Sequence, residues 1–92
     1  MQTSISNTPQ GKVFNAGFMA RIGLLNNVVR RLRAAGCRVL DERLEGLRPC
    51  VLIASAPPEG WRMGAVQRQR MDDGWRVSVV VDEIEIVWGE SA

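Results

Sequence analysis

The sequence predicts an α+β domain in which one long amphipathic helix packs on a four- to five-stranded antiparallel β-meander. Apolar residues recur with helical spacing over residues 16–35, and after Gly36 the pattern changes to short extended segments. Turn signals of a few residues separate these segments, and strands joined by such short turns run antiparallel. The 92 residues are enough for one domain, 1–92, in which residues 1–10 are expected to form a flexible arm.

The helix is predicted to run from about Ala16 to Ala35. Asn15 suits its N-cap because an asparagine side chain accepts a hydrogen bond from a free amide of the first turn. Gly36 suits the left-handed residue that ends a helix, with Cys37 packing back toward the last turn. The apolar stripe follows steps of four, three, four and three residues through Phe18, Ile22, Leu25, Val29 and Leu32.

Five strands are expected after the helix, near residues 38–44, 50–54, 61–70, 75–81 and 84–88. The run Val51-Leu52-Ile53 is apolar without alternation, which suits a strand that is covered on both faces or lies centrally in the sheet. Asp72-Asp73-Gly74 predicts a hairpin turn in which Gly74 is able to take a positive φ. Asp82-Glu83 predicts a second short turn.

The composition argues against an enzyme. The chain contains no histidine, which is the usual general base near neutral pH. Its paired acids lie side by side on tight turns, so their carboxylates point apart, and no phosphate loop, nucleophile elbow or metal-ligand spacing is present. We therefore expect no catalytic residue, no cofactor and no bound metal.

Two cysteines, Cys37 and Cys50, begin two predicted strands and can lie near one another, and the preferred interpretation is two buried apolar residues rather than a redox pair. No apolar run approaches the roughly 20 residues of a membrane span. The opening lacks the pattern of a secretory signal, so a cytoplasmic location is expected.

Charge is distributed unevenly, because residues 1–40 contain six basic residues and no acid. The polar face of the helix is the first candidate binding surface, formed by Asn26, Asn27, Arg30, Arg31 and Arg33. Such a ridge suits contacts with phosphates and base edges. It also suits a solvated helix face whose late arginines are favoured by the helix dipole, and this second interpretation is preferred.

Arg68 and Arg70 are the second candidate, on one face of the third strand with glutamines on the other. A polar ribbon of this kind can bind phosphate or read a groove, but the preferred interpretation is the solvated end of a hairpin or a charged edge that discourages aggregation. Trp88 is expected to be the most exposed tryptophan and available to a partner.

The opening of the chain, Ser4-Ile5-Ser6-Asn7-Thr8-Pro9 followed by residues 13–22 (VFNAGFMARI), resembles short open reading frames of bacteriophages and other mobile elements of Gram-negative bacteria. The resemblance covers roughly the first half of the chain and carries no residue roles. It implies a small accessory protein that acts by binding something in the host cell.

The expected function is therefore non-enzymatic binding to a host or phage protein, through the polar helix face or the hairpin that contains Arg68 and Arg70. Nucleic-acid binding through the same arginines is the alternative. A homodimer or larger assembly, formed through an open edge of the sheet, is the third hypothesis.

Overall fold

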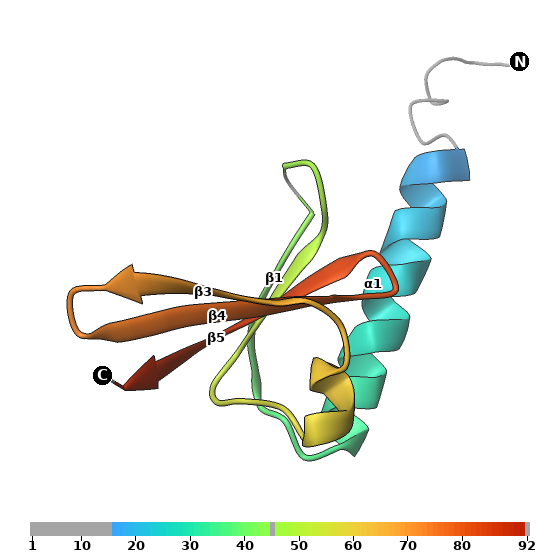
Figure 1. Ribbon diagram of the computed structural model, residues 1–92. Helices are drawn as coiled ribbons and strands as arrows, with labels where there is room; N and C mark the ends of the chain where they lie inside the picture. Colours follow the sequence, from blue (N-terminus) through green and yellow to red (C-terminus); the bar gives the residue numbers. More distant parts are fainter. Residues whose placement is uncertain (1–15, 45, 92) are drawn as a thin grey trace, which may run out of the picture.

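The computed structural model describes residues 16–44 and 46–91, and in it one helix lies on one face of a five-stranded sheet (Figure 1). The predicted α+β class is confirmed. The expected arm, residues 1–10, and the expected cap Asn15 lie outside the described residues. The elements in chain order are helix α1 (Ala16–Ala34), strands β1 (Val39–Arg43) and β2 (Cys50–Ile53), the 3₁₀ helix η1 (Glu59–Arg62), and strands β3 (Val66–Met71), β4 (Gly74–Val81) and β5 (Ile84–Ser91).

Helix α1 ends as predicted. Gly36 has φ +88°, a conformation that glycine adopts without strain. The amide of Cys37 donates to the carbonyl of Leu32 at 2.9 Å, and the amide of Gly36 donates to that of Arg33 at 3.0 Å. These two bonds are those of a Schellman motif, which satisfies carbonyls that the helix leaves free.

The hydrophobic core lies between α1 and the facing side of the sheet. The C-terminal half of the predicted stripe is buried there, whereas Phe18 and Ile22 are only half-buried. On the sheet, alternate residues of the central strands point toward the helix. The buried core cluster contains Leu25, Val28, Val29 and Leu32 from α1, with Val51, Ile53, Val77, Val79, Ile84, Ile86 and Trp88 from the sheet.

The sheet is mixed, so the predicted antiparallel meander is wrong. Its strand order is β1-β2-β5-β4-β3, and β2 runs parallel to β5 while the other neighbours are antiparallel. Short turns join β1 to β2, β3 to β4 and β4 to β5, but the segment after β2 contains Pro57, Pro58 and η1. That segment carries the chain to the far edge of the sheet, and the following strands then return toward β2.

The third strand begins later than predicted. Residues 59–62 form η1 instead, where the amide of Trp61 donates to the carbonyl of Pro58 at 2.9 Å. Proline before this segment removes a donor that a strand would need, and Trp61 packs against the core from η1.

The two hairpin turns differ from each other. Asp82 and Glu83 both have positive φ, at 50° and 68°, which is the backbone of a type I′ turn. Gly74 does not use the positive φ that a glycine in this turn is able to take. Gly74 is required for another reason, because a Cβ at this position would fall on the main-chain carbonyl of Glu90 in β5.

Candidate functional site

The arginines of the helix face are mostly engaged with the protein itself. Arg31 donates from Nη1 to Oδ2 of Asp82 at 2.6 Å, and its guanidinium lies 4.9 Å from the centroid of the Trp61 ring. Arg33 lies 3.9 Å from Oε2 of Glu42. Arg31 and Arg33 therefore attach α1 to the turn after β4 and to β1, rather than forming a free row of cations.

The other predicted residues of this helix face do not form a cluster of charges. Arg30 and Asn26 are exposed, while Asn27 is half-buried. Among the five predicted residues, and within the described part of the chain, Arg30 is the one arginine without a carboxylate or aromatic partner. One free guanidinium does not make the row of phosphate contacts on which nucleic-acid affinity depends.

The hairpin of β3 and β4 holds the second predicted group. Its arginines lie over one ring of β4, with the guanidinium carbon of Arg68 5.7 Å and that of Arg70 5.3 Å from the centroid of Trp75. Arg68 also donates to Oε1 of Glu90 at 2.5 Å. Both arginines are exposed to solvent, and their side chains lie on the face of the sheet that also packs against α1.

Trp88 is buried, with 1% of its surface exposed, so the prediction of an exposed tryptophan is wrong. Alternation along β5 places Trp88 on the side of the sheet that faces α1, next to Ile86 in the core. Its indole Nε1 donates to Oε2 of Glu90 at 3.0 Å. This bond, together with the guanidinium of Arg68, lowers the pKa of Glu90 from its usual 4.5.

The opposite face of the sheet is the feature that the sequence analysis missed. Among residues 16–44 and 46–91, no helix lies on this face. Register places Leu52 of β2 beside Val87 of β5, and Val87 beside Ser78 of β4, all pointing away from α1. Leu52 is 38% exposed and Val80 is 41% exposed. We call this surface the uncovered face.

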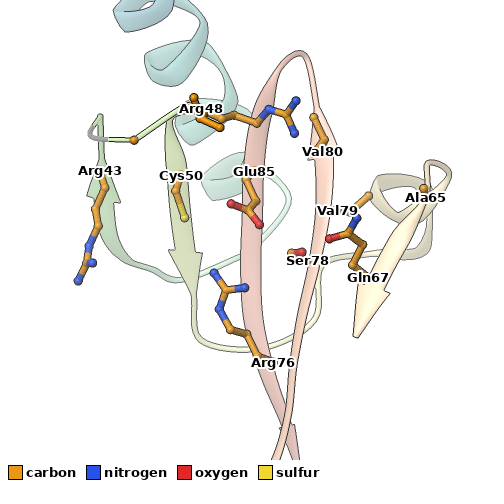
Figure 2. Close-up of a pocket in the computed structure, with 12 residues that line it drawn as sticks. Arg43, Arg48, Cys50, Ala65, Gln67, Arg76, Ser78, Val79, Val80 and Glu85 are labelled. Atoms are coloured by element: carbon orange, nitrogen blue, oxygen red, sulfur yellow. The ribbon is translucent and has the colours of Figure 1, made fainter. Parts of the chain in front are cut away.

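A hollow of about 680 Å³ lies on the uncovered face (Figure 2). Glu85 projects into it from β5, with Arg48 reaching over one end and Arg76 approaching from the other. Neither arginine has a carboxylate partner among the described residues. Arg43 also lines the hollow, and its side chain pairs with Asp41 at 2.9 Å, which lowers the pKa of Asp41.

Two small polar groups form part of the lining. Ser78 is only 5% exposed, and no hydrogen bond of its hydroxyl joins it to another described residue. A buried hydroxyl without a partner is uncommon, because it loses its hydrogen bonds to water on burial. Burial raises the pKa of the Cys50 thiol, and the charge of Glu85 adds to the effect. The thiol stays protonated near neutral pH and is a poor nucleophile.

The two cysteines do not meet, and both are half-buried rather than buried as expected. Both are free. Cys50 pairs with Arg43 at one end of the β1–β2 hairpin, whereas Cys37 precedes the other end and packs against the core on the helix side. The described residues contain no group of three or more metal-ligating side chains.

A signal for the uncovered face was present in the sequence. The run Val51-Leu52-Ile53 indicated a strand apolar on both sides, and Ile86-Val87-Trp88 has the same character. A single helix can cover only one side of a sheet. An apolar side of these strands was therefore to be expected without a helix packed on it.

No known protein family, curated protein or solved structure matches this chain. In the described part of the chain, no helix is both long and apolar enough to cross a membrane. The assignment of a function therefore depends on the geometry of the two surfaces described above.

Proposed function

We propose that this protein is a non-enzymatic accessory protein that binds another protein through its uncovered face. The observation that supports this proposal is that β2 is apolar on both of its sides, whereas α1 covers only one side. Val51 and Ile53 are buried against α1, whereas Leu52 between them is 38% exposed. An uninterrupted apolar run such as Val51-Leu52-Ile53 is typical of a strand that is covered on both faces.

The charges around the hollow favour a partner with acidic side chains. Arg48 and Arg76 flank the single carboxylate of Glu85 and have no partners of their own among the described residues. Within residues 16–44 and 46–91, the hydroxyl of Ser78 has no hydrogen-bond partner either. A segment that places an apolar side chain over Leu52 and an acid on the side of Arg48 or Arg76 away from Glu85 supplies an arginine with a carboxylate, and charge-assisted hydrogen bonds are the strongest kind.

The resemblance of the first half of the chain to mobile-element open reading frames supports a partner in a Gram-negative host or in a phage. The alternative, nucleic-acid binding by the helix arginines, has less support. Arg31 and Arg33 are occupied by Asp82 and Glu42.

The test is site-specific photocrosslinking in a Gram-negative host, with the crosslinker at Leu52 in one variant and at Met63 in another. Met63 is a matched control, because it is apolar and exposed but lies outside the uncovered face. A protein captured from position 52 alone is then purified and titrated against the wild type, Leu52→Glu and Met63→Glu.

We expect Leu52→Glu to weaken binding by about tenfold or more, since a charge replaces a buried contact at the interface. Met63→Glu should bind like the wild type. Equal binding by Leu52→Glu and the wild type contradicts the proposal. Crosslinks from position 52 only to nucleic acid, or only to a second copy of the chain, contradict it as well.

A further inference from the structure

Strand β3 is one edge of the sheet, and its outer side is unpaired among the described residues. All six of its residues are exposed. It pairs with β4 from Val66 opposite Val79 to Met71 opposite Gly74 without a register shift. A regular edge presents a row of unpaired amides and carbonyls that can pair with another strand.

The opposite edge, β1, is different. Its register with β2 shifts between Val39 and Asp41. A shift of this kind bends and twists the strand, and bulged edges resist the addition of a further strand. The two edges are therefore not equivalent, and β3 is the regular one.

Charged side chains often protect an edge strand, but the arginines of β3 do not project beyond it. Arg68 and Arg70 lie 5.7 and 5.3 Å from the centroid of Trp75, a ring of the neighbouring strand β4. Both side chains therefore lean inward across the sheet. This arrangement leaves the backbone of the edge accessible.

The hairpin geometry identifies the accessible backbone groups. Met71 and Gly74 flank a two-residue turn, so they face each other as a hydrogen-bonded pair. Such pairs alternate along an antiparallel ladder. The amides and carbonyls of Val66, Arg68 and Arg70 consequently point outward. The accessible backbone and the two arginines belong to the same residues.

We propose that the β3 edge binds an extended acidic segment of another protein as an added strand. Arg70 lies over Trp75 but has no carboxylate partner among the described residues. A strand with an acid beside Arg70 supplies that partner when the long arginine side chain turns from Trp75 toward it, and the strand also pairs with the outward backbone groups. A second copy of β3 in antiparallel pairing would instead bring arginines together, and like charges on neighbouring strands destabilise a sheet.

Fluorescence anisotropy with two labelled peptides tests this proposal. One peptide is an eight-residue segment that alternates valine with glutamate, and the other alternates valine with lysine. The protein variants are Arg70→Glu and Arg30→Glu, which change the net charge equally. Arg30 is exposed on α1, away from β3.

We expect the glutamate peptide to bind the wild type, and Arg70→Glu to weaken that binding by about tenfold, the effect of one charge-assisted hydrogen bond. Arg30→Glu should have little effect. Arg70→Glu should in turn bind the lysine peptide better than the wild type does. Equal weakening by Arg70→Glu and Arg30→Glu would show general charge attraction and overturn the proposal.

Amide hydrogen exchange provides a second readout. Bound glutamate peptide should slow exchange at Val66, Arg68 and Arg70. No such protection, or a dimer that pairs through β3 in light scattering, would contradict the proposal. A DNA duplex that binds more tightly than the peptide and depends on Arg70 would contradict it too. Leu52→Glu should leave the peptide titration unchanged, so this proposal and the one for the uncovered face fail independently.

Discussion

Replacement of Gly74 by alanine separates two explanations of why glycine occupies this position. If glycine served only to permit a positive φ, asparagine would be the best substitute, because it tolerates the left-handed region. In the structure the requirement is space. A Cβ at Gly74 would fall on the carbonyl oxygen of Glu90 and lie 3.3 Å from Cα of Ser91.

The loss of stability in Gly74→Ala depends on which atoms the new Cβ would contact. Both belong to the main chain of β5, so no side-chain rotation relieves the contact. Relief requires separating the last pairs of β4 and β5, which are Gly74 with Ser91 and Trp75 with Glu90. Overpacking of this kind costs about 1–3 kcal/mol of unfolding free energy. For a domain of this size, that lowers the melting temperature by about 4–24 °C.

Thermal unfolding followed by circular dichroism measures the effect, and Gly89→Ala is the matched control. Gly89 is also a strand glycine paired with β4, but its Cβ would meet only the carbonyl oxygen of Trp75 at 3.8 Å. Gly89→Ala should keep or slightly raise the melting temperature. Gly74→Asn should be at least as destabilising as Gly74→Ala. Equal melting temperatures for Gly74→Ala and Gly89→Ala, or a stable Gly74→Asn, would refute the argument from space.

Three further outcomes are expected. Leu32→Ala removes a side chain with 0% exposure from the core, and should lower the unfolding free energy by about 2–5 kcal/mol in urea titrations. Glu83→Gly should raise the unfolding free energy by about 0.5–1 kcal/mol, because Glu83 has φ 68° in a type I′ turn and glycine adopts this conformation without strain. An unchanged urea midpoint would contradict this expectation. The pKa of Glu90 is lowered in the folded state, so its stabilisation is present above its usual 4.5 and is lost as the pH falls through the folded value. Urea midpoints of Glu90→Gln measured from neutral to acidic pH should therefore depend less on pH than those of the wild type.

Local features of the fold were predictable because they depend on neighbours in the chain. Gly36 ended the helix in the left-handed region, as its position after an apolar stripe indicated. The strand from Trp75 to Val81 was recognisable because its residues alternate, and a strand with one buried face must alternate.

Pairing between distant segments was not predictable in the same way. Nothing near Cys50 in the sequence indicates that β2 lies parallel to β5, because this neighbour is chosen by the path of the segment that contains η1. The burial of Trp88 had the same origin, since its direction depends on which side of β5 faces α1. The uncovered face was hidden for a related reason: its residues come from several strands and gather only when the sheet forms.

The parallel contact of β2 with β5 also has a consequence for how the chain folds. It runs from Cys50 opposite Glu85 to Leu52 opposite Val87, and in the described sheet it alone joins the β1–β2 hairpin to the strands β3, β4 and β5. Hairpins close within about 1–10 μs because their strands are adjacent in the chain. The β2–β5 contact must instead wait for a loop that contains η1, β3 and β4 to close, which costs more entropy. We therefore expect the β1–β2 hairpin and the group of strands β3, β4 and β5 to form rapidly. The pairing of β2 with β5 should then limit the rate at which the protein folds.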